Sequence, residues 1–307
     1  MSSLSRSTFT RRGRSLVEGQ RSELTIVNAD DGKLDVILVA DEILEAPNWT
    51  PDGETLVFNA GGEIWTIPVD GKQVPVKVET GSIRDINNDH VLSPDGNTLY
   101  LSSDDGHLYC VPITGGEPRR VSNVHATPHH YYLHGISPDG DTLSYVAVEG
   151  TAEQRRVNLF TIPARGGSDV RLTDVTYPND GPEYSPDGAW IYFSSERAAS
   201  RPGHAQCFRM RPNGSDIEQL TFDQRVNWFP HVSPDGRTLV YISYPEGTIG
   251  HPPNKDVLLR LMTADGKDQR NLVGLFGGQG TLNVNSWAPD SRRLAYVAYP
   301  IEDSSAA

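Results

Sequence analysis

The segment Ser185-Pro186-Asp187-Gly188, or a close variant of it, occurs six times in this chain of 307 residues. Successive prolines of the six copies are separated by 43, 44, 48, 48 and 55 residues. A repeat of that length indicates one supersecondary unit copied six times. The other copies are Thr50–Gly53, Ser93–Gly96, Ser137–Gly140, Ser233–Gly236 and Ala288–Ser291.

Each copy carries the pattern of four short strands. The Ser-Pro-Asp-Gly segment has the residues of a type I turn, and an alternating apolar run such as Trp190–Phe193 follows it. A second run such as Leu159–Pro163, a turn containing glycine and a short run such as Val170–Leu172 complete the unit. Four antiparallel strands in about 45 residues predict the blade of a β-propeller.

The last repeat is incomplete, because only one further strand pattern, at 293–299, follows Trp287. Residues 23–39 carry the pattern of a third and fourth strand, so we expect them to complete blade six and close the ring. The predicted fold is all-β, a single six-bladed propeller over 21–301. Blade starts are expected near residues 46, 89, 133, 181, 229 and 284.

The composition excludes several classes of protein. The net charge is −13 and no cluster of Lys and Arg lies beyond the first 20 residues, so we expect no nucleic acid as partner. No apolar stretch approaches the roughly 20 residues that span a bilayer, so no membrane span is expected. Residues 1–20 are predicted to be a disordered basic tail, and 302–307 a second tail. The chain contains no Gly-x-Ser-x-Gly, phosphate loop or His-Glu-x-x-His motif.

The polar residues point to one face of the ring. The Ser-Pro-Asp-Gly turns and the turns between third and fourth strands share one face, here called the bottom face. The loops between second and third strands and the links between blades lie on the opposite, top face. Three of these loops are long (149–156, 196–205 and 244–256), and all nine histidines fall in or next to top-face segments. Long loops on a rigid scaffold commonly carry function, so we expect the site at the top mouth of the central channel.

Residues near the starts of the innermost strands are the candidates for this site. His90, His134 and His231 with Glu183 could bind a divalent metal, since imidazole and carboxylate together suit Mn, Zn or Fe, with Ca as a further possibility. The alternative is that these side chains hydrogen-bond one blade to the next. Candidate ligand-binding residues are Tyr132, Asp180, Trp228, Gln279, Asn283 and Asn285.

The repeats from about Glu23 to Tyr299 resemble the WD-like blades of the TolB-type propeller family. This resemblance implies a six-bladed ring that holds a peptide or protein segment over its channel. It would also imply an exported protein with an N-terminal α/β domain, whereas residues 1–20 contain arginines but no apolar stretch of a secretory signal. Cys110 and Cys207 fall in different blades, as expected for unpaired thiols in a reducing compartment. We therefore predict a cytoplasmic protein.

A weaker resemblance connects the chain with oligogalacturonate lyases, which are seven-bladed propellers with a bound metal. His231 and Gln279 fall at places comparable to the metal ligands of those lyases. Asn283 and Asn285 stand where the lyases have histidines. This resemblance implies a metal-assisted activity whose ligand set is incomplete in this chain.

Two functions therefore stay open at the level of the sequence. The first is a binding module that holds a peptide or protein segment, or a small polar ligand, on the top face. The second is a metal-assisted lyase or hydrolase acting on a carbohydrate or related small molecule. Its candidate catalytic residues are Glu183, His231, His251, Lys255 and Arg260. Convergence of these side chains in one pocket would favour the enzyme.

Overall fold

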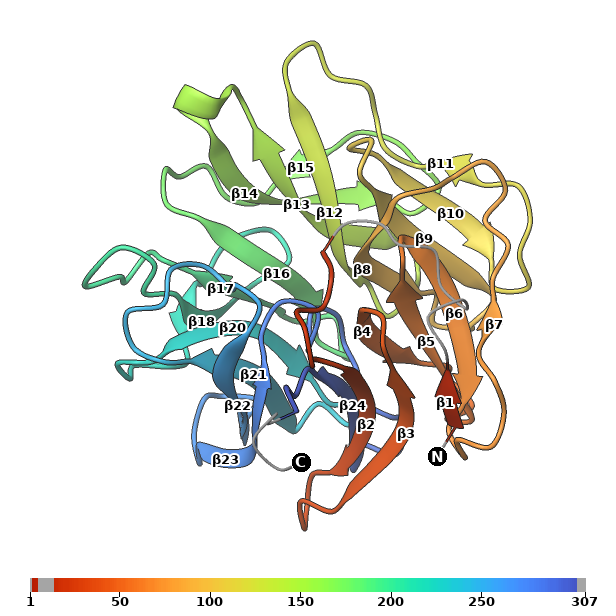
Figure 1. Ribbon diagram of the computed structural model, residues 1–307. Helices are drawn as coiled ribbons and strands as arrows, with labels where there is room; N and C mark the ends of the chain where they lie inside the picture. Colours follow the sequence, from red (N-terminus) through yellow and green to blue (C-terminus); the bar gives the residue numbers. More distant parts are fainter. Residues whose placement is uncertain (1, 5–13, 303–307) are drawn as a thin grey trace.

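Six four-stranded sheets are arranged as a ring in the computed structural model, which describes residues 2–4 and 14–302 (Figure 1). The described residues contain no α-helix, only the 3₁₀ turn η1 (Ala152–Gln154). The prediction of an all-β, six-bladed propeller is confirmed. No helix of the described part of the chain is long and apolar enough to cross a membrane.

The first five blades each use four consecutive strands, ordered from the channel outward. Blade one contains β4 (Leu44–Trp49), β5 (Thr55–Ala60), β6 (Glu63–Pro68) and β7 (Val76–Lys77). Blade two contains β8 (Ile86–Leu92), β9 (Thr98–Ser103), β10 (Leu108–Pro112) and β11 (Arg119–Arg120). Blade three contains β12 (His129–Ile136), β13 (Thr142–Glu149), β14 (Arg156–Pro163) and β15 (Val170–Arg171).

Blades four and five repeat the plan. Blade four contains β16 (Asn179–Tyr184), β17 (Ile191–Ser195), β18 (Gln206–Met210) and β19 (Glu218–Gln219). Blade five contains β20 (Val226–Val232), β21 (Thr238–Tyr244), β22 (Lys255–Thr263) and β23 (Arg270–Gly277). The innermost strands of these five blades begin two to four residues before the expected starts.

The two ends of the chain meet in blade six. There β24 (Arg293–Ala298) pairs antiparallel with β2 (Ser22–Asn28), which pairs with β3 (Leu34–Ala40). The segment before β24 contributes only a bridge between Trp287 and Leu294. The short strand β1 (Ser2–Leu4) adds to the outer edge parallel to β3. This closure joins strands more than 260 residues apart and leaves no open seam between the last blade and the first.

The repeated turn is held by the side chains that define it. In blade four the Ser185 hydroxyl donates to Asp187 Oδ1 (2.5 Å) and accepts from the Trp190 amide (2.9 Å). The Gly188 amide donates to the Ser185 carbonyl (2.8 Å). Gly188 has a φ of 69°, a conformation that glycine adopts without steric cost. Each Ser-Pro-Asp-Gly copy therefore begins a second strand at a fixed point of its blade.

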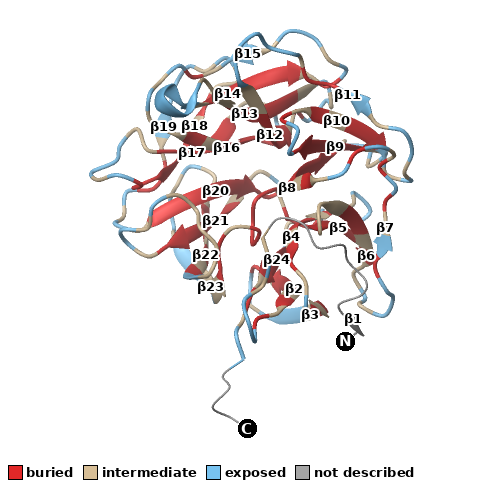
Figure 2. Ribbon diagram, turned by 45° about the horizontal axis from the view of Figure 1, so that its top comes forward, coloured by how far each residue is buried: buried red, intermediate tan, exposed pale blue. Residues whose placement is uncertain are grey.

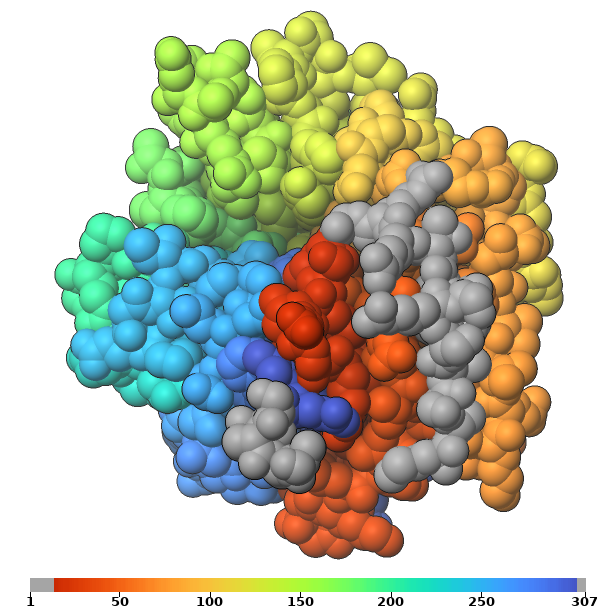
Figure 3. Space-filling model, in the orientation of Figure 1, coloured from red at the N-terminus to blue at the C-terminus, as the bar shows by residue number. Residues whose placement is uncertain are grey.

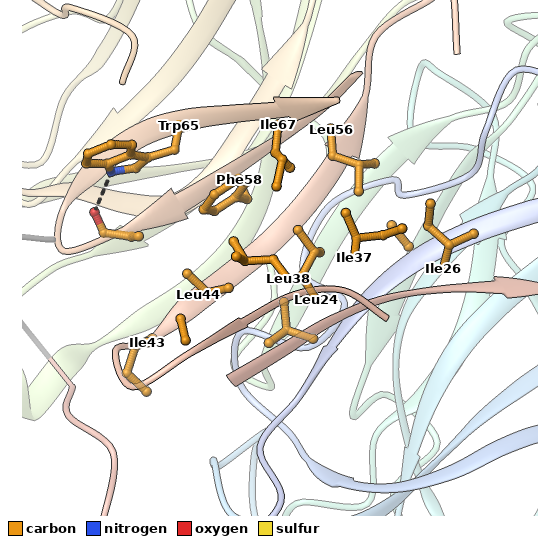
Figure 4. Close-up of a cluster of buried hydrophobic side chains, with 14 of the residues drawn as sticks. Leu24, Ile26, Ile37, Leu38, Ile43, Leu44, Leu56, Phe58, Trp65 and Ile67 are labelled. Atoms are coloured by element: carbon orange, nitrogen blue, oxygen red, sulfur yellow. Dashed lines mark hydrogen bonds between the residues drawn. The ribbon is translucent and has the colours of Figure 1, made fainter. Parts of the chain in front are cut away.

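The core lies between neighbouring blades rather than at one centre. Figure 2 shows buried residues along the strands and exposed residues mainly at outer strands and loops. Leu24 and Leu38 of blade six pack with Leu56 and Phe58 of blade one in one such cluster (Figure 4). Burial of each such side chain contributes roughly 1.5–3 kcal/mol, so packing as well as strand pairing stabilises the closing seam.

Five innermost strands share a local irregularity that shapes the channel. Each carries a register shift shortly before its turn, and a bulge of this kind aims the side chains on its two sides in different directions. Residues before and after the bulge therefore form separate groups in the channel. The shifts lie between Glu45 and Asn48, Ile86 and His90, Leu133 and Gly135, Asp180 and Glu183, and Trp228 and His231.

The segment 14–20 precedes the blades and lies on the ring (Figure 3). Composition places it in the basic tail, yet Gln20 donates to the Tyr299 carbonyl (2.9 Å) and to Asn254 Oδ1 (2.9 Å). Arg14 donates to the Gln279 carbonyl (2.7 Å). These polar side chains find partners on the propeller, which composition alone does not reveal. Residues 1, 5–13 and 303–307 lie outside the described residues, so predictions about the tails stay predictions there.

Candidate functional site

A cavity of about 320 Å³ lies at the channel mouth, where blades two to five converge. A second central cavity, of about 280 Å³, is lined by Pro51, Pro94 and Pro234 of the bottom-face turns, so the first lies toward the opposite, top end. The walls of the first cavity, here called the mouth cavity, contain both polar and apolar side chains. The polar side chains include Asp89, His134, Arg155, Asp180, His251, Gln279 and Asn283, and the apolar ones include Val146, Val148, Val157 and Phe229.

Asp180 joins two histidines at the centre of the polar wall. Its Oδ1 lies 3.1 Å from His134 Nε2, and its Oδ2 lies 3.2 Å from His251 Nε2. Burial by itself would raise the pKa of Asp180, but the hydrogen bonds from both rings outweigh it and hold that pKa well below the usual range. Asp180 is therefore an ionised carboxylate shared between blades three and five.

Both histidines also have acceptors on their second nitrogens. His134 Nδ1 lies 3.2 Å from the Asn283 carbonyl, and His251 Nδ1 lies 2.6 Å from Gln279 Oε1. A ring with acceptors on both sides must carry two N–H groups, which is the imidazolium form. Burial opposes that charge in His134, but the carboxylates of Asp89 and Asp180 outweigh it and raise its pKa to about 9. For His251, burial is likewise outweighed by Asp180, and its pKa is raised.

Asp89 is the polar group of the cavity that lacks a complete set of partners. The residue is 5% exposed, and its Oδ1 makes no hydrogen bond within the described structure. Burial raises the pKa of Asp89 to about 6, with His134 acting in the opposite direction. A buried carboxylate oxygen without a donor is costly, so this atom is a candidate contact for a bound molecule.

Backbone geometry fixes the part of the cavity wall that contains Phe229 and Gln279. Gly278 has a φ of 123°, and a Cβ there would collide with the Pro252 carbonyl, so only glycine lets this segment cross so closely. That crossing places Gln279 against His251. Phe229 has a φ of 54°, held by a hydrogen bond from its amide to Ser194 Oγ (2.9 Å). Its ring lies against His134 and His251, with centroids 5.7 and 4.9 Å apart.

A second group of predicted residues lies on the other side of the bulges and does not join the cavity. His231 Nδ1 contacts Glu183 Oε2, and Glu183 Oε1 accepts from the Val232 amide (3.1 Å) and from Asn285 Nδ2 (2.7 Å). His231 is fully buried, and Glu183 is 5% exposed. These bonds connect blade four to blade five and to the start of blade six. The geometry agrees with the structural alternative for His231, Glu183 and Asn285.

The remaining predicted residues are dispersed. Tyr132 lines the mouth cavity, and the Trp228 ring packs against His251 with centroids 5.0 Å apart. His90 is fully buried, lines neither central cavity, and has its pKa lowered to about 4 by burial. Lys255 is exposed at the start of β22. Arg260 pairs with Asp223 and lies over the Tyr241 ring, away from the mouth.

The residues do not fit the metal site that the lyase resemblance implies. Among residues 2–4 and 14–302, no group of three or more His, Cys, Asp or Glu side chains is arranged to hold a metal ion. His231 is engaged by Glu183, whereas Gln279 is engaged by His251 in a different network. In the tentative set, His134 and Glu183 both line the second central cavity, whereas His90 and His231 line neither central cavity.

A neighbouring cavity of about 240 Å³ extends the mouth toward blades one and two. It shares Asn87, Asn88 and Gln279 with the first cavity. Glu45 and Arg14 also line it, and Glu45 Oε1 lies 3.4 Å from Arg14 Nη2. Burial raises the pKa of Glu45, and Arg14 partly opposes that shift.

Sequence reasoning selected His90 as a candidate ligand and not its neighbour Asp89. It missed Arg14, Glu45 and Phe229 as lining or shaping residues. The signal for Asp89 was available in the repeat alignment. Five residues before the turn proline, the other blades have Ala46, Leu133, Gly181, Phe229 and Val284, so Asp89 is a charged residue at an otherwise uncharged position.

Comparisons with known proteins agree with this architecture. Residues 136–257 match the TolB β-propeller domain family. An uncharacterized protein of Agrobacterium fabrum is 40% identical over 288 residues, which cover 92% of this chain and 94% of that protein. A solved structure from Agrobacterium tumefaciens, proposed to be a TolB, has a TM-score of 0.84 at 39% identity and covers 92% of this chain and 99% of that one.

The lyase resemblance is present at the level of the fold. An oligogalacturonate lyase in complex with manganese has a TM-score of 0.57 at 18% identity. The match covers 85% of this chain and 75% of that chain. At this identity the likeness concerns the arrangement of blades and carries no residue roles to this chain.

Proposed function

Because this chain belongs to the TolB-like β-propeller family, we propose that it is a binding module whose channel mouth holds a polar ligand. The ligand is a small polar molecule or the end of a peptide or protein segment, and it donates a hydrogen bond to Asp89. The observation that carries this proposal is the buried Oδ1 of Asp89, which has no partner and lines the cavity.

The surroundings of Asp89 support a preformed site. His134, Asp180 and His251 hold one another through hydrogen bonds from three blades, so a ligand need not order them. Valines and Phe229 exclude water from one side, which strengthens a hydrogen bond to a carboxylate. A cavity of about 320 Å³ lies at the lower end of the range for small-molecule sites. It suits a compact ligand or one or two side chains of a longer segment.

Binding to three probes tests this proposal: glucosamine, digalacturonate and the peptide Gly-Arg-Gly, each titrated by calorimetry. We expect a probe that carries a cationic donor to bind, and Asp89→Asn to weaken that binding by about tenfold or more, since a charged hydrogen bond is worth roughly 1.5–3 kcal/mol. Asp268→Asn is the matched control, because Asp268 is exposed in a bottom-face turn. Equal binding by wild type and Asp89→Asn would contradict the proposal.

A second candidate is an enzyme that moves a proton on a carbohydrate or related small molecule. It is favoured by the separation of pKa values at the mouth, about 6 for Asp89 and about 9 for His134. Groups separated in this way can act as general base and general acid. Turnover of digalacturonate that disappears in Asp89→Asn would favour this function over binding alone. The cytoplasmic location and the lack of a nucleic-acid partner stay predictions from the sequence.

A further inference from the structure

The second mouth cavity already contains an occupant from the same chain. The guanidinium of Arg14 donates to the Gln279 carbonyl (2.7 Å) and lies 3.4 Å from Glu45 Oε1. It also lies over the Tyr299 ring, 4.5 Å from the centroid. A carboxylate, a carbonyl and an aromatic face together form a typical guanidinium site, because Arg combines a planar hydrogen-bonding fork with stacking on a ring.

The pocket around Arg14 is acidic. Asp85 and Asp104 line the same cavity as Glu45. Burial raises the pKa of Asp104, and the neighbouring Asp85 adds to that shift, as expected where carboxylates lie close together. Such a wall favours a cationic ligand over a neutral or anionic one.

Arg14 uses this site only in part. Its Nε and Nη2 are buried and make no hydrogen bond in the described structure. Three of the five N–H donors of the guanidinium, one on Nε and two on Nη2, therefore lack an acceptor with good geometry. An occupant held by one hydrogen bond and a 3.4 Å ion pair can be exchanged for one that fits better.

The segment that carries Arg14 is built like a strap. It is anchored at Gln20, which is buried and bonded to Tyr299 and Asn254. Residues 17–19 between the anchor and Leu16 are exposed, and Gly19 has a φ of 75°. Rotation at this exposed stretch would withdraw Arg14 and lift Leu16 from its packing on the cluster between blades six and one, while the strand pairing of the blades stays intact.

We propose that Arg14 is a resident occupant of a guanidinium subsite, and that the ligand of the channel mouth is an arginine-bearing peptide segment that displaces residues 14–19. The inference rests on the proposed function for the position of the ligand, because the guanidinium subsite adjoins the Asp89 cavity through Asn87, Asn88 and Gln279. A neighbouring donor of the same peptide would then reach Asp89.

Titration of Gly-Arg-Gly into full-length wild type and Arg14→Ala tests the inference. If the strap is closed in most molecules, its removal raises the apparent affinity by about tenfold. Gly-citrulline-Gly, which has nearly the same shape without the guanidinium charge, should bind more weakly than Gly-Arg-Gly and should not distinguish the two proteins. Arg21→Ala is the matched control, because Arg21 belongs to the same region but pairs with Glu23 and Glu302 outside the cavity.

A second measurement covers the case in which Arg14→Ala folds poorly. Glu45→Gln removes the charge that holds Arg14, so trypsin should cleave after Arg14 severalfold faster than in wild type, as followed by mass spectrometry. Unchanged peptide affinity in Arg14→Ala together with unchanged cleavage in Glu45→Gln would overturn the inference. In that event a loss of probe binding in Asp89→Asn would still support the proposed function, so the two failures are distinguishable.

Discussion

Two carboxylates that lie three residues apart on β16 have different surroundings and different expected roles. Asp180 pairs with His134 and His251 at the wall of an open cavity, whereas Glu183 pairs with His231 in the buried channel lining. Both are carboxylate–imidazole groups at blade junctions. The bulge between Asp180 and Glu183 separates them.

The difference lies in what surrounds each pair. Glu183 also accepts from the Val232 amide and from Asn285, so its hydrogen-bonding capacity is used within the protein. The Asp180 group adjoins Asp89, whose Oδ1 has no partner. A satisfied polar network stabilises and specifies a fold, while an unsatisfied group beside a cavity indicates a place for a ligand. Residue type alone does not distinguish the two cases.

Removing the carboxylate of the buried group is expected to have the largest effect. Glu183→Ala leaves His231 Nδ1 and the Val232 amide without an acceptor, and loss of one partner of a buried pair costs about 3–5 kcal/mol. Urea unfolding measures the change. Glu246→Ala, at an exposed residue, should cost less than about 1 kcal/mol. A loss below 1 kcal/mol for Glu183→Ala would mean that the network is not structural.

The group formed by Asp180, His134 and His251 should make the unfolding free energy fall at alkaline pH. His134 has its pKa raised to about 9, so the stability it contributes is fully present below its usual pKa and is lost as pH rises through 9. The raised pKa corresponds to about 3 kcal/mol at one pKa unit per 1.4 kcal/mol. His134→Gln puts a hydrogen-bonding amide that cannot titrate in place of the imidazole, and it should flatten the pH dependence of the unfolding free energy between pH 6.5 and 9. An unchanged slope in this variant would contradict the assignment of His134 as a cation.

Ionisation of Asp89 should change the unfolding free energy at acidic pH. The change has the opposite sign to the one that an ion-paired carboxylate produces. Its folded pKa of about 6 exceeds the usual value, so its stabilising neutral form is present at low pH and is lost as pH rises through 6. Asp89→Asn should therefore gain about 2–3 kcal/mol relative to wild type between pH 3.5 and 7.5. Chemical denaturation across that range measures the gain. The same pH dependence of the unfolding free energy in both proteins would show that burial does not penalise the ionised form of Asp89.

The smallest expected effects concern His231 and His251, which the sequence alone does not distinguish. His231→Ala should lower the unfolding free energy by about 2 kcal/mol, because it leaves the buried Glu183 without its imidazole. His251→Ala should cost less than about 1 kcal/mol, since the ring is partly exposed and Asp180 keeps His134. Probe binding should be weakened more by His251→Ala than by His231→Ala. Equal destabilisation by both substitutions would remove the distinction.

Much of the fold follows from local patterns in the sequence. The six turns, the alternating strands and the unpaired pattern at 23–39 specify blade count and ring closure, because each depends on residues adjacent in the chain. The strand pair β24–β2 completes blade six as predicted. The bulges carry a weaker signal, and they decide which side of the channel each polar residue faces.

Only part of the candidate site could be predicted from the sequence. Asp180, His134, His251, Gln279 and Asn283 were all named from their positions and share one cavity. Lys255 and Arg260 were named as candidate catalytic residues, and they lie elsewhere because β22 is the third strand outward from the channel in its blade.

By itself the sequence determined that this protein is a closed ring of six blades with a polar top face, because turn chemistry and strand periodicity act over a few residues. Only the tertiary structure decided which carboxylate is satisfied and which is left open. Hydrogen-bond partners such as Asn285 for Glu183 and Arg14 for Glu45 come from segments distant in the chain. Their meeting depends on the bulges and on how blades pack around the channel, which no local pattern encodes.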